Sequence, residues 1–135
     1  MIIAELRANE GRVGGMWEGT PLLLLHHTGA NSGVSRVNPI TYLPDGSRYL
    51  IWASNGGAPK DPHWYFNLRA DPNTSVEVGS ETIAVVAAEA AGGERERLWA
   101  MAAERYPQLI EVAHKAGSRV ISLITSSPNP AIEPE

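Results

Sequence analysis

The segment ASNGGAPKDPHWYFNL, from Ala53 to Leu68, combines a strand end, a glycine turn, a helix start and an aromatic face. Gly56 and Gly57 allow backbone angles that other residues resist. Asp61 and Pro62 predict a helix with Asp61 as its N-cap and proline at its first position. A helix N-terminus beside a glycine turn attracts anions. The segment therefore predicts a corner that holds a ligand, or an ordinary strand-to-helix connection in which Gly and Pro serve geometry alone.

Two turn signals favour antiparallel pairing of the strands around this segment. Pro44-Asp45-Gly46-Ser47 joins two apolar runs and Gly79-Ser80-Glu81 joins two more, so each pair of runs is expected to form a hairpin. From Glu94 onward the apolar residues change to helical spacing. This order predicts an α+β fold, a barrel or strongly curled sheet with flanking helices. The expected strands are 21–27, 37–43, 48–53, 74–78, 82–88 and 119–125, and the expected helices are 62–70, 94–105 and 107–115.

Composition limits the class of protein. A chain of 135 residues with 43% hydrophobic residues is large enough for one domain with its own core. The net charge of -4 argues against a nucleic-acid surface, which needs clustered Lys and Arg. The absence of cysteine excludes disulfides and thiolate chemistry and suits a cytoplasmic location.

The two ends of the chain carry separate expectations. Residues 2–10 have a short amphipathic helix pattern, which does not fit a secretory signal peptide. No apolar run reaches membrane-spanning length. We expect further residues ahead of Met1 in the natural protein, and membrane association through such residues stays open. Residues 1–125 are expected to form one domain, and 126–135 a flexible tail rich in Ser and Pro.

The central segment, continued to Pro72, resembles the signature of the deazaflavin (F420)-dependent nitroreductase family, often abbreviated Ddn. Other blocks of that family follow in matching order over nearly the whole chain, and their joint occurrence is more specific than any single block. These blocks are Leu6–Gly15 (LRANEGRVGG), Pro21–Leu25 (PLLLL), Thr28-Gly29, Ser32-Gly33, Arg36, Pro39 and Tyr42-Leu43.

The resemblance implies a fold and an activity. The fold would be the split β-barrel of flavin-binding proteins, with coenzyme F420 in a groove and FMN as the less favoured ligand. The activity would be hydride transfer from the reduced deazaflavin to an electrophilic small molecule such as a quinone, an enone or a nitro compound. A non-catalytic protein that binds the deazaflavin, a lipid or another apolar ligand is the alternative. Pairing into a homodimer also stays open.

The resemblance further implies which residues hold the coenzyme. Arg36 matches the family's basic residue after the Gly-x-x-Ser-Gly loop, where a guanidinium would bind phosphate; otherwise it would be interpreted as a solvated arginine. The backbone at Asn38, Pro39 and Ile40 would line the ring on one side, and Pro39 suits a strand edge turned to a ligand. On the opposite side, backbone N–H groups would bind the ring carbonyls. The residues of this second wall would be Ala53, Ser54, Asn55, Gly56 and Gly57.

The start of the predicted helix supplies more binding candidates. Pro62, His63 and Trp64 match positions that approach the coenzyme in the family. Trp64 lies about one turn from Asn67, and His63 and Asn67 have i, i+4 spacing, so one helix face would present a ring and an amide to the ligand. Trp64 also suits the core. Their neighbours, Tyr65 and Phe66, are interpreted as core residues.

Two residues are candidates for catalysis. The Ser54 hydroxyl would bond the ring or the substrate, or make a local turn hydrogen bond. Tyr106, or water, would supply a proton, although its ring could simply pack at the helix junction. Leu109 and Val112 stand where the family would have further tyrosines, so activation of nitroimidazoles does not transfer.

Departures from the family pattern motivate the alternative function. Ala30, Asn31 and Asn55 stand where the family commonly has basic residues. Asn can still donate a hydrogen bond, and Lys60 can enter the field of the anion, but the loss of charged contacts puts tight coenzyme binding in doubt.

Other kinds of site find little support. His26 and His27 point to opposite sides of a strand and cannot share one metal ion without distortion, so no metal site is predicted. Glu94, Glu96 and Glu104 fit a solvated helix face better than an acid/base pair. No Gly-x-Ser-x-Gly or Walker-type motif is present.

Overall fold

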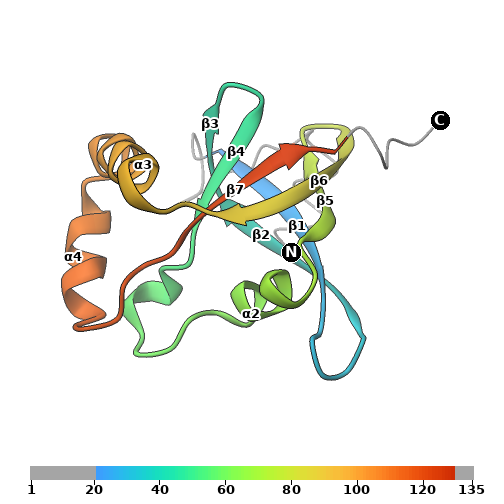
Figure 1. The fold of residues 1–135 in the computed structure, drawn as a ribbon, viewed down its shortest axis with the longest axis horizontal. Helices are drawn as coiled ribbons and strands as arrows, with labels where there is room; N and C mark the ends of the chain where they lie inside the picture. Colours follow the sequence, from blue (N-terminus) through green and yellow to red (C-terminus); the bar gives the residue numbers. More distant parts are fainter. Residues whose placement is uncertain (1–20, 130–135) are drawn as a thin grey trace.

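The strands of the central sheet pair antiparallel throughout, in the order β2-β1-β5-β6-β7-β4-β3 (Figure 1). The computed structural model describes residues 21–129. Within this range the strands are β1 (Leu22–Thr28), β2 (Ser35–Thr41), β3 (Leu43–Asp45), β4 (Arg48–Trp52), β5 (Asn73–Val78), β6 (Glu81–Glu89) and β7 (Leu123–Pro128). The helices are the short 3-10 turn η2 (Asn55–Gly57), α2 (His63–Ala70), α3 (Gly92–Arg105) and α4 (Gln108–Lys115).

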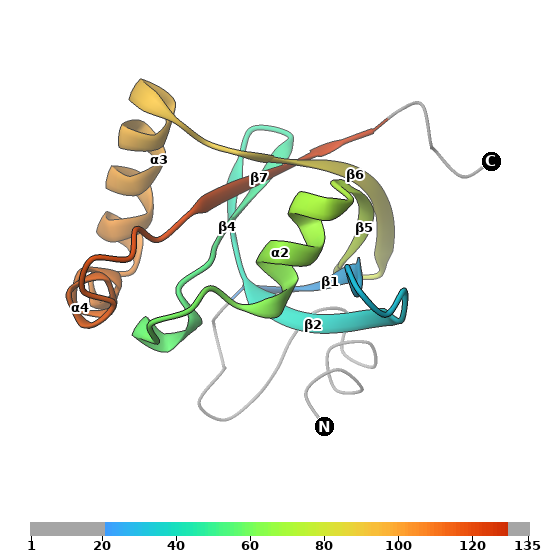
Figure 2. The same ribbon diagram turned by 60° about the horizontal axis from the view of Figure 1, so that its bottom comes forward.

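Two hydrophobic cores lie on opposite faces of the curled sheet. Figure 2 shows the sheet curving around α2, with α3 and α4 together at one end. Ile51 and Trp64 belong to the core between the sheet and α2, whereas Leu50, Leu98 and Leu123 belong to the core beneath α3 and α4. Neighbouring side chains of a strand point to opposite faces, so β4 contributes to both cores. This half-open barrel with flanking helices confirms the predicted α+β split-barrel fold.

The predicted strand at 37–43 proves to be two strands with different partners. Residues 35–41 form β2, which pairs along its whole length with β1, and 43–45 form β3, which pairs with β4. Tyr42 separates them, and its N–H donates to the carbonyl of Pro21. The expected hairpin with 48–53 therefore forms as β3 and β4, but only Leu43 of the predicted strand takes part in it. Pro44 and Asp45, which were expected in the turn, belong to β3. The second predicted hairpin is confirmed as β5 and β6.

The last strand begins later than predicted, at Leu123 rather than residue 119. The segment before it bonds to the glycine-turn region instead, since the Ala53 N–H donates to the Ser122 carbonyl. Ser126 is fully buried in β7, so residues 126–128 belong to the fold and not to the predicted tail. The expected N-terminal helix at 2–10 and the rest of the tail from 130 lie outside the described residues.

Helix α2 begins differently from the prediction. Its N-cap is Pro62, whose side chain has no hydrogen-bond acceptor. The predicted cap, Asp61, lies one residue earlier, and its carboxylate accepts a hydrogen bond from Arg119 at 2.7 Å. Tyr65 is buried as predicted, but Phe66 is 48% exposed and does not pack in the core. An i, i+1 pair on a helix faces different directions, so only one of these two rings could reach the core.

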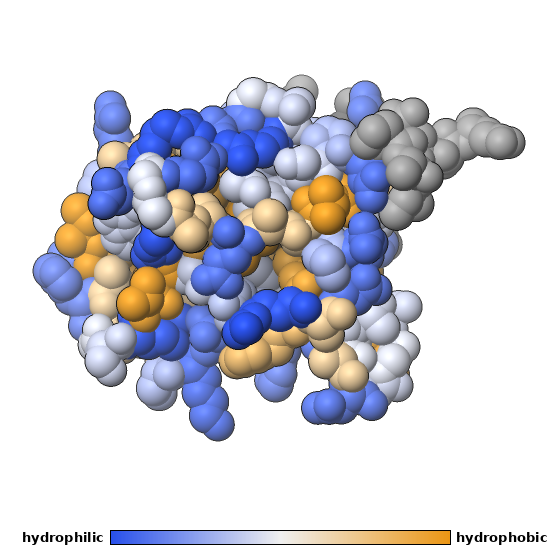
Figure 3. Space-filling model, in the orientation of Figure 1, coloured by the Kyte–Doolittle hydropathy of each residue, from blue (hydrophilic) through white to orange (hydrophobic). Residues whose placement is uncertain are grey.

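Exposed apolar side chains are dispersed over the surface. The face in Figure 3 is mostly hydrophilic, with apolar residues in separate small groups. The large exposed hydrophobic residues are Val34, Phe66, Val86, Ile110 and Val120, from different elements of the fold. Within residues 21–129, no helix has the length and apolar character that crossing a bilayer would require.

The turn η2 has a left-handed backbone at three successive residues. The φ angles are 47° at Asn55, 63° at Gly56 and 82° at Gly57. Glycine adopts this conformation without penalty, and Asn tolerates it better than most residues. At Gly57 a Cβ atom would also lie 2.9 Å from the Lys115 Cβ atom of α4. The Gly-Gly pair therefore serves both the turn and its close packing on α4.

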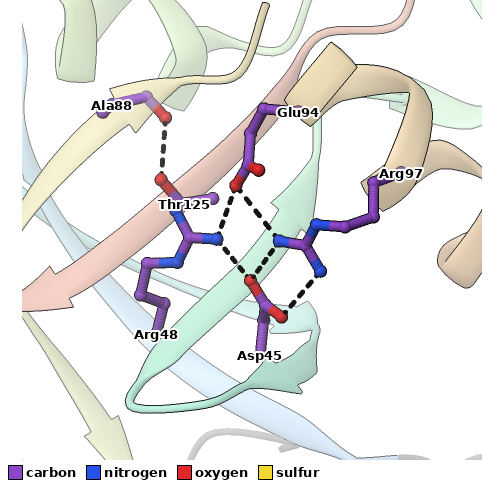
Figure 4. Close-up of polar contacts among 6 residues, drawn as sticks. All are labelled: Asp45, Arg48, Ala88, Glu94, Arg97 and Thr125. Carbon is purple, nitrogen blue, oxygen red and sulfur yellow. Dashed lines mark hydrogen bonds and ion pairs between the residues drawn. The ribbon is translucent and has the colours of Figure 1, made fainter.

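An ion-pair cluster joins the β3–β4 hairpin to α3 (Figure 4). Arg48 bonds to Asp45 and, at 2.6 Å, to Glu94. Arg97 bonds to the same two carboxylates at 2.9 and 3.1 Å. Thr125 nearby donates to the Ala88 carbonyl of β6 at 3.4 Å. The ion pairs therefore hold α3 against the β3–β4 hairpin.

The ion-pair cluster makes the free energy of unfolding depend on pH in the acid range. Hydrogen bonds from Arg97 and then Arg48 lower the pKa of Asp45 from 3.8 to about 2. Since this pKa is depressed in the folded state, the stabilisation is complete above pH 3.8 and is lost as the pH falls toward about 2. We expect Asp45→Asn to lower the free energy of unfolding at pH 7 by about 1 kcal/mol after solvent screening. In urea unfolding, the difference between Asp45→Asn and the unsubstituted chain should shrink at low pH. The control is Glu81→Gln, an exposed site outside the cluster, which should leave the free energy of unfolding at pH 7 nearly unchanged.

The glycine turn gives a second stability prediction. Gly56→Ala places a side chain in open space on a left-handed backbone and should cost ~1–2 kcal/mol. Gly57→Ala adds the contact with Lys115 and should cost at least ~1 kcal/mol more. Thermal and urea unfolding of the two variants measures the difference. Equal losses would show that α4 does not constrain the turn.

Candidate functional site

A cavity of about 920 Å³ opens where β2, the end of β4, the glycine turn and the start of α2 meet. Strand β2 forms one wall, and the segment after β4 forms the other. The lining residues are Asn38, Pro39, Ile40, Thr41, Trp52, Ser54, Asn55, Gly56, Lys60, Asp61, Pro62, His63, Trp64 and Phe66.

Most residues predicted to bind a cofactor lie together in this cavity. They are Asn38, Pro39, Ile40, Ser54, Asn55, Gly56, Lys60, Pro62, His63 and Trp64. The prediction that Pro39 lies on an edge strand is confirmed within the described sheet, because β2 stands at its end. The structure thus brings residues far apart in the chain to one surface, and their role in binding stays a prediction.

Four predicted binding residues do not line the cavity. Ala53 is fully buried, and its N–H donates to Ser122. Gly57 packs against α4, and its N–H donates to the Ser54 carbonyl at 2.9 Å. Arg36 is exposed on β2 opposite His27, outside the cavity wall. The fourth residue is Asn67.

Asn67 belongs to a polar network behind the cavity. Its side chain is bonded to His27 Nδ1 at 2.9 Å and accepts from the Ala30 N–H at 3.0 Å. His27 Nε2 lies 2.6 Å from the Asn38 side-chain oxygen in the cavity wall. Burial lowers the pKa of His27, so the ring is neutral near pH 7, accepts at Nδ1 and donates at Nε2. The structure therefore does not bring Asn67 to the cavity beside His63, because the Asn67 amide is bonded to His27.

Two side chains of the glycine turn differ in availability. The Asn55 amide donates to the Lys60 carbonyl at 2.9 Å and holds the loop closed. The Ser54 hydroxyl makes no cap hydrogen bond, and within the described chain it has no hydrogen-bond partner. The local turn bond considered for Ser54 is absent, which leaves its hydroxyl available to a ligand.

Tyr106 lies behind the cavity wall. Its ring packs on Trp52 with centroids 5.5 Å apart, and Trp52, not Tyr106, lines the cavity. Burial raises the pKa of Tyr106, and its hydroxyl is buried without a partner among the described residues. The structure therefore does not bring Tyr106 to the cavity as the predicted proton donor.

Several lining residues were missed by the sequence analysis. Trp52 ends β4 just before the glycine turn, so its place next to the predicted wall, and not strand periodicity, could have suggested it. Phe66 shares a helix face with His63 three residues earlier, which could have found it too. Thr41 continues the wall of β2, and Asp61 was assigned to capping.

Arg119 is the least expected contributor, because it lies far along the chain from the turn it contacts. Its side chain is 10% exposed and donates to the carbonyls of Ala53, Ser54 and Ala58 and to the Asp61 carboxylate. The distances are 2.7–2.9 Å. Arg119 thus fixes the segment that carries one cavity wall.

Known proteins are similar to this chain in sequence and fold. A family model described as F420H(2)-dependent quinone reductase matches residues 2–127. An F420H(2)-dependent quinone reductase of Mycobacterium tuberculosis (strain H37Rv) is 45% identical over 82 residues, which are 60% of this chain and 55% of that protein. The chain thus spans about half the length of the curated relatives it first matches.

Solved structures agree with the family match. An F420-H2 dependent reductase (FDR-A) is 38% identical with a TM-score of 0.72, over 79% of this chain and 94% of that one. A structure described as a domain-swapped dimer is 35% identical with a TM-score of 0.73, over 93% and 94%. The predicted F420-dependent class is confirmed, but the matching family is the quinone reductases and not the Ddn nitroreductases. The chain belongs to the F420H(2)-dependent quinone reductase family.

Proposed function

We propose that this chain is an F420-dependent reductase that delivers a hydride from the reduced deazaflavin to a quinone, with enones and nitro compounds as further acceptors. The observation that carries the proposal is that one cavity collects most of the predicted binding residues in a chain of this family. Cofactor sites are commonly clefts of ~300–1,000 Å³, with apolar walls and a few polar groups. The cavity has this size and this mixture of side chains.

The residues present fit a flat ring system that carries polar edges. Trp52, Trp64 and Phe66 offer aromatic surface, and the free Ser54 hydroxyl offers a hydrogen bond. Because the N–H groups of Ala53 and Gly57 already have acceptors, those of Ser54, Asn55 and Gly56 are the donors left on this wall. We assign these groups to the ring edge. The proposed N–H donors are thus three of the five residues that the sequence analysis named for this wall.

The phosphorylated arm of the coenzyme would leave the cavity along β2. Residues two apart on a strand share a face, so Arg36, Asn38 and Ile40 lie in one row. Arg36 stands outside the lining at the end of this row, and exposed Lys60 lies on the other wall. We assign Arg36 and Lys60 to the anionic groups. The Asn55 amide is already bonded to the loop, so it adds little to that binding.

The chemistry divides between coenzyme and protein. Bound reduced F420 supplies a hydride, and with one proton a quinone becomes a hydroquinone while the coenzyme is oxidised by two electrons. The protein positions the ring, excludes bulk water with its aromatic residues and stabilises charge at the ring edge. Since Tyr106 does not line the cavity, we assign the proton to water.

Two copies of the chain are also proposed to pair. The support is the relative of 35% identity described as a domain-swapped dimer. Both end strands of the described sheet carry a proline, Pro39 in β2 and Pro44 in β3. Proline disfavours the addition of a further strand. Pairing is therefore expected to use side-chain surfaces or exchanged segments.

A direct test of the function uses spectroscopic titration and turnover. We expect oxidised F420 to bind more tightly than FMN, and a menadione-type quinone to reoxidise reduced F420 catalytically. Binding of F420 without quinone-dependent oxidation of the reduced coenzyme would favour the alternative, a non-catalytic binding protein, which the missing basic residues suggested. Preference for FMN would contradict the coenzyme assignment.

Salt dependence separates the two parts of the proposed binding mode. Arg36→Ala should weaken F420 binding by about tenfold at low salt and much less at high salt, because it removes a charged contact. Phe66→Ala should weaken binding to the same extent at both salt concentrations. Phe66 is the better aromatic probe than Trp64, because its exposed side chain adds little to the core. Equal salt responses in the two titrations would contradict these roles.

A further inference from the structure

Arg119 binds the back of the glycine turn through three nitrogens. Nη1 donates to the Ala53 carbonyl at 2.9 Å, Nη2 to the Ser54 carbonyl at 2.7 Å and Nε to the Ala58 carbonyl at 2.9 Å. Nη1 also donates to Asp61 at 2.7 Å. Arg119 itself does not line the cavity, whereas Ser54 does. A mostly buried cation therefore stands behind this wall.

The planarity of the peptide bond gives these contacts a direction. In a trans peptide, the C=O of one residue and the N–H of the next point in opposite directions. No cis peptide occurs in the described residues. When Arg119 holds the carbonyls of Ala53 and Ser54, the N–H groups of Ser54 and Asn55 must point away from the guanidinium. These two residues are in the cavity wall.

We propose that Arg119 is a positioning residue that orients and polarises the N–H groups of Ser54 and Asn55 toward the cavity. This inference rests on the proposed function, because it gives those N–H groups the anionic edge of the reduced ring to stabilise. A positive charge on each carbonyl strengthens the dipole of that peptide, and cooperative hydrogen bonds strengthen one another in a low dielectric. The reduced coenzyme should benefit more than the oxidised one, because its ring edge carries more negative charge.

A guanidinium suits this role better than an ammonium group. Its planar fork presents donors in fixed directions, so one side chain can hold several carbonyls and a carboxylate together. A lysine at this position retains the charge but has one nitrogen, which cannot reach all four oxygens. Arg119→Lys therefore removes orientation while it keeps the positive charge.

The experiment compares Arg119→Lys with Arg48→Lys in the full chain. Arg48 also bridges two carboxylates, but it belongs to the Asp45–Glu94 cluster and not to the cavity. We expect Arg119→Lys to move the amide proton signals of Ser54 and Asn55 upfield in NMR spectra of the protein without coenzyme. Its Kd for reduced F420 should rise about tenfold, and that for oxidised F420 clearly less. Arg48→Lys should leave these amide signals and both Kd values unchanged.

The outcomes separate this inference from the proposed function. Unchanged Ser54 and Asn55 signals, or equal rises in both Kd values, would overturn the role of Arg119. Absence of F420 binding by the unsubstituted chain would overturn the proposed function, and the amide signals would still decide whether Arg119 orients the turn. If Arg119→Lys does not fold, the side-chain NMR signals of Arg119 in the unsubstituted protein decide. Separate, slowly exchanging Nη signals support a clamped guanidinium, and averaged signals contradict it.

Discussion

The fold depends on β4 and β7, the paired strands that are buried on both faces. Leu50 and Leu123 pack beneath α3 and α4, while Ile51 and Ile124 pack toward α2. Removing either strand would take residues from both cores. Because β4 runs directly into the glycine turn, its position also sets where the cavity wall begins. The site is therefore built at the end of the most constrained element of the sheet.

Local signals were sufficient for much of the fold. The hairpin of β5 and β6, the α3 and α4 helices and the buried run of β1 all follow from spacing and turn residues. The errors fall where long-range contacts decide. Residues 119–122 have a strand-like pattern, but Arg119 and Ser122 bond to the glycine turn, which delays β7. The end of β2 depends on a tertiary bond from Tyr42, which no local pattern reveals.

In the candidate site too, local sequence signals were sufficient for some features, and long-range contacts decided the others. Family motifs located most of the wall, since Ser54, Gly56 and Trp64 belong to the central segment and Pro39 to another matching block. They could not show which donors are already used, as at Ala53 and Gly57, because that depends on partners elsewhere in the fold. Nor could they show that Asn67 lies outside the cavity lining, since its amide is bonded to His27. Whether a polar group already has a hydrogen-bond partner in the fold, more than its residue type, decides whether a ligand can bind it.

The chain of contacts from Asn67 through His27 to Asn38 has an evolutionary consequence. It couples helix α2 to strand β2, so the spacing between the two walls can change only if several side chains change together. Phe66 and Lys60 line the same cavity but are exposed, and single substitutions there leave this coupling intact. Under the proposed function, differences in acceptor preference among related chains are expected at the rim of the cavity, because a change in the gap between the two walls would require several substitutions together.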